Sequence, residues 1–204
     1  MAGPKRKDGE LDRRYKANRG QSNASNNNQY VKGANELIDK LMAVMDYIEN
    51  DVPLVIGTEA VNHFKESFTN EGFTDTGLKK WQSRASKRTG NTANQAILTK
   101  SGELGDSIDF RIEGKTIVIY SDKKYAQIHN EGGIITVTDS MRKYFWSQFY
   151  LAKEAADKEL MEQWKFLALS KEIRIPKRQF IGESETLNQR IAEKMERDLT
   201  NILT

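Results

Sequence analysis

The sequence predicts an α+β fold, in which several amphipathic helices pack with a small antiparallel sheet and an extended arm precedes them. Three observations indicate this class. Apolar residues recur at helical spacing near both ends of the domain, two short apolar runs flank a glycine turn in its middle, and a polar, basic segment opens the chain. At 204 residues, the chain is long enough for one main domain with its own core.

The first 31 residues combine positive charge with a polar tract. Residues 1–20 contain seven Lys and Arg against three Asp and Glu, a local charge of +4, so the rest of a chain whose total is +3 is about neutral. The tract QSNASNNNQ has almost no apolar surface to bury, and burial is what offsets the entropy lost on ordering. We therefore predict a disordered arm over residues 1–31, at least in the isolated protein, and a single domain over residues 32–204.

The cationic side chains of this arm suit either of two partners. Clustered Lys and Arg neutralise the phosphates of a nucleic acid without needing a fold, and they equally suit a tail that docks on a protein. Both interpretations stay open at this point. The candidate arm contacts are Lys5, Arg6, Lys7, Arg13 and Arg14.

Two helices are predicted after the arm. The first begins at Ala34 and runs for about four turns, until Asp51 and Pro53 end it. The second ends near Asn70. Their apolar stripes are Leu37, Ile38, Leu41, Met45 and Ile48 in the first helix, and Ile56, Ala60, His63, Phe64 and Phe68 in the second.

The middle of the chain predicts a connection and a hairpin. Residues 70–95 are rich in Gly, Thr, Asn and Lys, which is typical of an irregular connection, and Trp81 is its expected anchor in the core. Apolar residues then alternate over residues 108–112, Glu113 to Lys115 supply a turn, and the β-branched run over residues 117–120 returns. This pattern predicts an antiparallel β-hairpin.

The last third predicts two more strands and further helices. Residues 134–138 and 172–175 have strand composition, and residues 139–170 form a helical excursion between them, with Asp139 as its expected cap. The many aromatic residues of this excursion at helical spacing favour a core or subunit interface over base stacking. A final amphipathic helix follows Ser184, its expected cap.

The stretch KYAQIHNEGG, residues 124–133, holds one of the two histidines. Tyr125, Ile128 and His129 share one face of a short helix, which Gly132 ends as a left-handed C-cap. A catalytic histidine needs an orienting partner and usually a nucleophile or a metal, and none has recognisable spacing here, although Glu131 or His63 could pair with His129. We interpret His129 as a packed or interface residue.

Composition and motifs argue against an enzyme and against a cofactor or metal site. The chain has no cysteine, which excludes disulfides, thiolate zinc sites and cysteine nucleophiles. Phosphate-loop, nucleophile-elbow and zinc-helix motifs are missing, so a hydrolase would need a site that we do not find. No run approaches the roughly 18–20 apolar residues of a membrane span, and the N-terminus lacks the apolar segment of a secretory signal. We expect cytoplasmic synthesis and no membrane partner.

Four segments in a fixed order resemble the phage virion morphogenesis or tail completion family, the Mu-like and P2-like proteins that finish the tail and join it to the head. The segments are FTNEGFTDTGLKKWQSR, ILTKSGELGDSI, YAQIHNEGG and IPKRQFIGES, and the resemblance covers about residues 34–204. Two positions depart from the family's pattern. Gln179 stands where the family usually has proline, and Thr76-Gly77 replaces its usual proline-glycine before the tryptophan.

The resemblance implies a structural virion protein of a tailed phage, made in the cytoplasm of the host bacterium and placed in the neck between head and tail. It implies binding without catalysis, and a ring of about six or twelve copies, with six favoured. The implied partners are the protein itself, the portal or adaptor, and the tail terminator or tube. The alternative is a nucleic-acid-binding accessory protein whose basic arm contacts DNA in the channel.

A closed ring needs two different complementary faces on each subunit. We assign Tyr125, His129 and the Gly132-Gly133 turn to one face, and residues 178–182 to another. The full set of candidate interface residues is Trp81, Tyr125, His129, Gly132, Gly133, Trp146, Arg178, Phe180 and Gly182.

Overall fold

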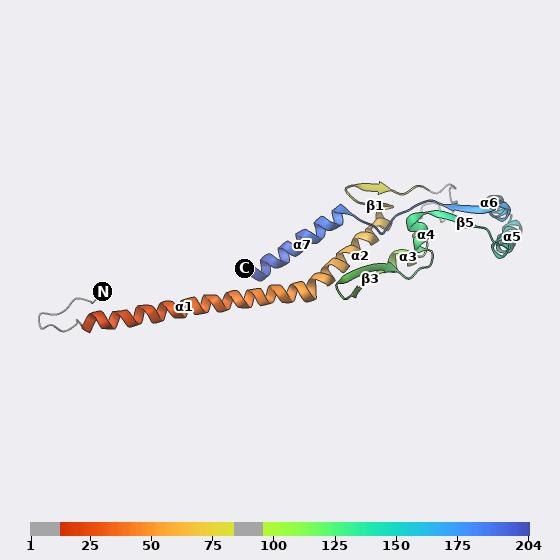
Figure 1. Cartoon of the computed structure of the whole chain (residues 1–204). Coiled ribbons are helices and arrows are strands. Elements are labelled where there is room, and N and C mark those ends of the chain that lie inside the picture. The colour runs from red at the N-terminus through yellow and green to blue at the C-terminus, as the bar shows by residue number, and fades with distance from the viewer. Residues whose placement is uncertain (1–12, 84–95) are drawn as a thin grey trace. The chain divides into compact units, whose positions relative to one another are not determined.

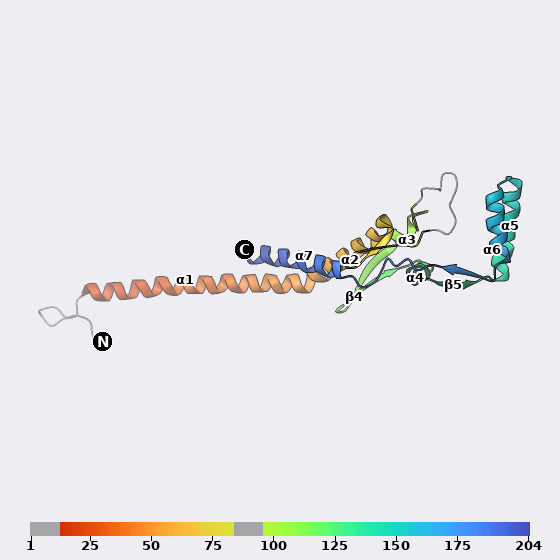
Figure 2. The ribbon, with the colours of Figure 1, turned by 90° about the horizontal axis from the view of Figure 1, so that it is seen from above.

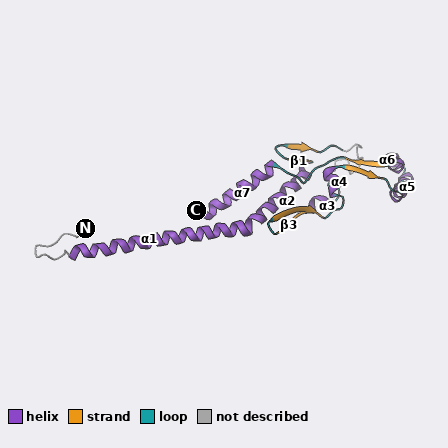
Figure 3. Cartoon of the chain, viewed as in Figure 1, coloured by secondary structure: helices purple, strands orange, loops and turns teal. Residues whose placement is uncertain are grey.

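The computed structural model describes residues 13–83 and 96–204, with side chains described from Gln29 onward. The chain divides into two compact units. One comprises the residues up to Leu54 together with Glu193–Thr204, and the other is Val55–Ala192. The units meet after Leu54 and again after Ala192, and the single domain over residues 32–204 stays a prediction. Helices and paired strands are both present in the chain, which confirms the α+β class (Figures 1 and 3).

Helix α1 (Arg13–Asp46) dominates the first unit (Figure 1). We expected a disordered arm through residue 31 and a helix from Ala34, but the structure starts the helix at Arg13 and so gives residues 13–31 a helical backbone. Ser, Asn and Gln have only slightly unfavourable helix propensities, and no proline occurs between residues 5 and 52 to stop propagation. Residues 1–12 lie outside the described part of the chain.

A π-helical turn, η1 (Tyr47–Asp51), joins α1 to α2 (Val52–Asn70). The predicted break at Asp51 and Pro53 is therefore wrong, because the chain stays helical there. The wide turn is closed by the backbone N–H of Val52, which donates to the carbonyl of Tyr47. Pro53, which has no N–H to donate, follows this wide turn as the second residue of α2. The predicted end of α2 at Asn70 is confirmed.

The strands of the second unit form three separate antiparallel pairs. The predicted hairpin is confirmed as β3 (Ile108–Glu113) and β4 (Thr116–Ser121), in which Glu113 lies opposite Thr116. Strands β5 (Gly133–Thr136) and β6 (Glu172–Ile175) also pair as expected. The connection that we expected to be irregular contains a further short pair, β1 (Gly72–Thr74) and β2 (Leu78–Lys80).

One aromatic core holds α2, the short strands and the chain around Phe180 together. The side chain of Phe180 is 0% exposed and its ring lies 5.1 Å from that of Phe68, which in turn lies 5.5 Å from the ring of Trp81. Trp81 thus anchors its connection as predicted. This first core consists of Ala60, Phe64, Phe68, Phe73, Trp81, Ile97, Leu104, Ile108, Phe180 and Leu187.

A second core lies in the helical excursion. Helices α5 (Asp139–Glu154) and α6 (Lys158–Leu169) lie side by side (Figures 1 and 2). Phe145 stacks on Trp164 between them with ring centroids 6.0 Å apart. The cap of α5 is Thr138, whose hydroxyl accepts from the N–H of Met141, so the expected Asp139 cap was displaced by one residue.

The remaining helices position the segments that carry the family resemblance. They are α3 (Glu103–Asp106), α4 (Ala126–Glu131) and α7 (Glu185–Leu203). Ser184 caps α7 as predicted, because its hydroxyl oxygen accepts from the N–H of Leu187 and its O–H donates to the carbonyl of Thr74. The predicted short helix at Tyr125 to His129 is α4.

Candidate interaction surfaces

The histidine stretch is held in place by an asparagine. Asn130 Oδ1 accepts from the N–H groups of Phe180 and Ile181 at 2.8 and 2.9 Å, and its Nδ2 donates to the carbonyl of Ile181 at 3.1 Å. One side chain therefore satisfies three main-chain groups of a segment about 50 residues away in sequence. The sequence did not predict this role of Asn130, because no local pattern connects it with residues about 50 positions away.

Gly132 ends α4 in a conformation that is open essentially to glycine alone. Its φ of 75° confirms the predicted positive φ, but its ψ of 172° places it outside the left-handed helical region. The space is closed as well, since a Cβ at this position would lie 2.7 Å from the backbone nitrogen of Lys177. Gly133 follows directly and pairs with Ile175 in the β5–β6 ladder.

Arg178 connects this turn to the tryptophan segment. Its backbone N–H donates to the carbonyl of His129 at 2.8 Å, while its Nη2 and Nε donate to the carbonyl of Gln82 at 3.1 and 3.3 Å. The arginine side chain is buried. Arg178 therefore connects two loops of its own chain through hydrogen bonds, and it is not an exposed cation.

His129 lies beside a pocket of about 300 Å³ that is also lined by Leu104, Tyr125 and Arg178. The half-buried imidazole packs edge-on against Tyr125, with ring centroids 6.1 Å apart, and its Nδ1 is buried without a hydrogen-bond partner. The proposed pairing with Glu131 or His63 is not found. His63 is itself buried, with its Nε2 3.0 Å from the carbonyl of Thr74.

Burial, and then the nearby charge of Arg178, hold the pKa of His129 below its usual 6.5. A histidine whose pKa is lowered by folding takes up its proton more readily in the unfolded chain. The unfolded state thus gains relative stability as pH falls below 6.5. The imidazole should consequently cost the protein stability on acidification.

We predict that the free energy of unfolding of the His129→Gln variant falls less between pH 7 and pH 5 than that of the native protein. Chemical denaturation at pH 7 and pH 5 would measure it, with the fall in unfolding free energy smaller in the variant than in the native protein. Equal falls in both proteins would contradict the assignment. Carboxylates that titrate in the same pH range affect both proteins equally, so their contribution to the fall in stability cancels in the comparison.

The four segments of the resemblance meet in the first core. Trp81 Nε1 donates to the carbonyl of Gln179 at 2.7 Å, Asn130 binds the next two residues, and Leu104 and Ile108 are buried in the same cluster. These motifs therefore specify packing, not an exposed site. Three expected interface side chains, those of Trp81, Arg178 and Phe180, are buried against their own chain.

A model of the phage virion morphogenesis family matches residues 30–200. The chain belongs to this family. Because the match spans all four segments, the resemblance seen in the sequence is confirmed, and membership in a virion morphogenesis family indicates a role associated with the phage virion. No curated protein and no solved structure matches the chain.

The exposed apolar surface of this virion morphogenesis protein lies elsewhere. Helices α5 and α6 form the α5–α6 hairpin, in which Trp146, an expected interface residue, packs on the second core beside Phe149. Other aromatic side chains of this hairpin are exposed. Phe166 is 72% exposed and Tyr150 58%. We call these outward residues the hairpin face: Tyr144, Tyr150, Leu151, Leu160, Phe166 and Leu169.

Helix α1 carries a second exposed apolar surface.

Tyr125 is the one exposed aromatic side chain in the expected interface set, at 42%, and Gly182 lies against the side chain of Gln179. Of the expected arm contacts, Lys5, Arg6 and Lys7 lie outside the described residues, and the side chains of Arg13 and Arg14 are not described.

Two structural findings bear on other classes of site. Among the described residues, no group of three or more His, Asp or Glu side chains is placed to hold a metal ion. No helix within that part of the chain is both long enough and apolar enough to cross a membrane.

Proposed function

We propose that this protein is a structural component of the phage neck, where it joins the head to the tail by binding and without catalysis. The family match over residues 30–200 carries the proposal. The arrangement of its motifs supports it, because the segments typical of the family build a core, and the exposed apolar side chains gather on other elements. Large exposed apolar patches on a protein mark surfaces that bind other proteins.

The proposed assembly is a ring of about six copies, or about twelve, around the channel. Ring closure needs two complementary faces on each subunit. Exposed apolar side chains on α1 and on the α5–α6 hairpin are available for contacts with neighbouring subunits and with neighbouring rings. The proposed neighbours are the portal or adaptor on the head side and the tail terminator or tube on the tail side.

Removal of the protein from a growing phage tests this function. We expect filled heads and finished tails to accumulate unjoined, and a plasmid copy to restore joined particles. Normal numbers of joined, infectious particles without the protein would contradict the proposal.

The hairpin face gives a more local prediction. Phe166→Glu together with Tyr150→Glu should leave the fold intact, because both side chains are mostly exposed, yet should reduce joining. Truncating a buried interface aromatic commonly costs about 2 kcal/mol or more, so at least about tenfold fewer joined particles are expected. Complementation followed by particle counting in the electron microscope measures this.

Glu162→Gln supplies the matched control, because it changes a charge one helical turn from Phe166 without removing apolar surface. We expect this control to join particles normally. Equal joining by the double variant and the control would remove the hairpin face from the interface.

A further inference from the structure

Exposed apolar side chains are concentrated on the part of α1 whose side chains are described, which begins at Gln29, and on the η1 turn after it. Twenty large apolar residues are exposed in the described chain, and eight of them lie on α1 and η1. A soluble protein seldom leaves so continuous an apolar surface in water unless something covers it. We define the α1 stripe as these eight residues: Tyr30, Val31, Leu37, Ile38, Leu41, Met42, Met45 and Ile48.

Five residues of the stripe, together with Ala34, form a regular heptad pattern. Steps of three and four residues alternate without interruption along one line of the helix, which is the spacing of a coiled-coil seam. The line runs for roughly 26 Å at about 1.5 Å per residue. Its members, in a and d positions by turns, are Val31 (a), Ala34 (d), Ile38 (a), Leu41 (d), Met45 (a) and Ile48 (d).

Helix α7 covers a different side of α1. Tyr47 OH donates to Asp198 Oδ2 at 3.0 Å, and Lys40 Nζ donates to the carbonyl of Leu203. Lys40 and Tyr47 are seven residues apart and therefore share one face, which is not the face of the seam. The chain's own C-terminal helix thus leaves the α1 stripe open.

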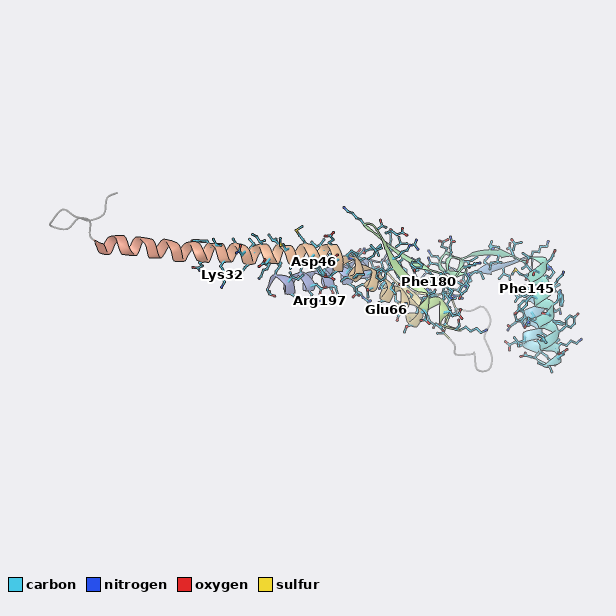
Figure 4. All side chains as sticks on the ribbon, turned by 90° about the horizontal axis from the view of Figure 1, so that it is seen from below. Lys32, Asp46, Glu66, Phe145, Phe180 and Arg197 are labelled. Atoms are coloured by element: carbon cyan, nitrogen blue, oxygen red, sulfur yellow. The ribbon has the colours of Figure 1, made fainter. Side chains whose placement is uncertain are left out.

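Charge on α1 favours a second copy of the same helix as the occupant. Every charged residue between residues 30 and 48 lies outside the seam and outside the e and g positions beside it, so two copies bring no like charges together across their contact. Lys32 and Asp46, labelled in Figure 4, belong to this group. The charged residues are Lys32, Glu36, Asp39, Lys40 and Asp46.

The choice of apolar residues points the same way. β-branched residues at a, here Val31 and Ile38, with leucine at d, here Leu41, suit the seam of a parallel coiled coil. Most of the stability of a helix in water comes from packing of its apolar face, and this face has no packing partner among the described residues. An α1 helix of a neighbouring subunit supplies that packing.

We propose that the α1 stripe is the surface through which copies of this chain associate, with α1 helices of neighbouring subunits packed parallel and in register. The inference rests on the proposed function for its setting, a ring of several copies, and it assigns the surface that holds them. Subunits related by rotation about the axis of a ring run in the same direction, which matches the parallel arrangement.

The first test is the mass of the purified full chain in solution. We expect the native protein to be oligomeric and Ile38→Lys with Leu41→Lys to be monomeric, because two charges would have to be buried in the seam. Glu36→Lys with Ala43→Lys places two lysines on the opposite side of the same helix and should stay oligomeric. Light scattering coupled to size-exclusion chromatography distinguishes these states.

The second test uses the absence of cysteine from the chain. Val31→Cys and Met45→Cys should each form disulfide-linked dimers under mild oxidation, because parallel seams bring the same a positions together. Glu36→Cys, on the far side, should not. Denaturing electrophoresis without reductant reads the result directly and does not depend on how the variants affect particle assembly.

Two sets of results would overturn the proposal. One is an oligomer that survives Ile38→Lys with Leu41→Lys, or a native protein that stays monomeric at high concentration. The other is cross-linking only in a mixture of Val31→Cys with Ile48→Cys, which would require antiparallel helices, because an a position then lies opposite a d position of the partner. If association through α1 holds while phage lacking the protein still joins heads to tails, the proposed function fails and this inference stands.

Discussion

Replacing Phe180 with alanine is expected to lower the free energy of unfolding by about 3–5 kcal/mol. The side chain is 0% exposed and packs against Phe68 in the first core, so its loss leaves a cavity as well as removing buried apolar surface. The hydrogen bonds that the backbone N–H groups of Phe180 and Ile181 donate to Asn130 hold the backbone in place and limit collapse of the cavity. Figure 4 labels the residue.

Urea denaturation followed by circular dichroism measures this change. Phe166→Ala removes the same ring from a site that is 72% exposed and should change stability by less than about 0.5 kcal/mol. Comparable losses in the two variants would mean that Phe180 is not the centre of the core.

The second large effect is expected at Gly132. Alanine there should cost at least about 2 kcal/mol, because a side chain is strained at this φ and ψ and its Cβ would press on the backbone of Lys177. The backbone of Lys177 cannot move away without a large energetic cost. The β5–β6 pair and the hydrogen bond from Arg178 to His129 hold the chain on either side of it. The loss should appear in the same denaturation experiment.

Gly114→Ala is the matched control for this prediction. Gly114 also has a positive φ, 61°, but nothing lies within 4 Å of the place where its Cβ would be. We expect a loss of about 1 kcal/mol from the backbone alone. If Gly132→Ala cost no more than Gly114→Ala, the close contact with Lys177 would not be restricting this turn.

Elements whose pattern is local were predictable from the sequence. The β3–β4 hairpin, strand β6 and the end of α2 follow from alternation, a glycine turn and a helical stripe that act over a few residues. The cap of α7 at Ser184 follows from the same kind of reasoning.

Features that depend on distant contacts or on weak preferences were not predictable. The start of α1 at Arg13 is decided by small propensities in a polar tract, and the π-helical turn before Pro53 is one of several ways to accommodate a proline. Asn130 acts on residues about 50 positions away, and no spacing rule connects them.

The burial of several candidate interface residues was not predictable for a related reason. Aromatic and glycine-rich motifs mark positions under strong constraint, but a sequence does not say whether the constraint is a partner or the protein's own core. Trp81 and Phe180 are constrained by packing, whereas the apolar stripe of α1, which the sequence predicts as one face of an amphipathic helix, is exposed. Burial had to be observed before these two cases could be separated.

The position of the protein in mature particles tests the central claim most directly. Electron microscopy of particles that carry a labelled copy should place the label at the junction of head and tail, in a ring of about six or about twelve subunits. Label on the capsid surface or at the far end of the tail, or its absence from joined particles, would contradict a role in the neck.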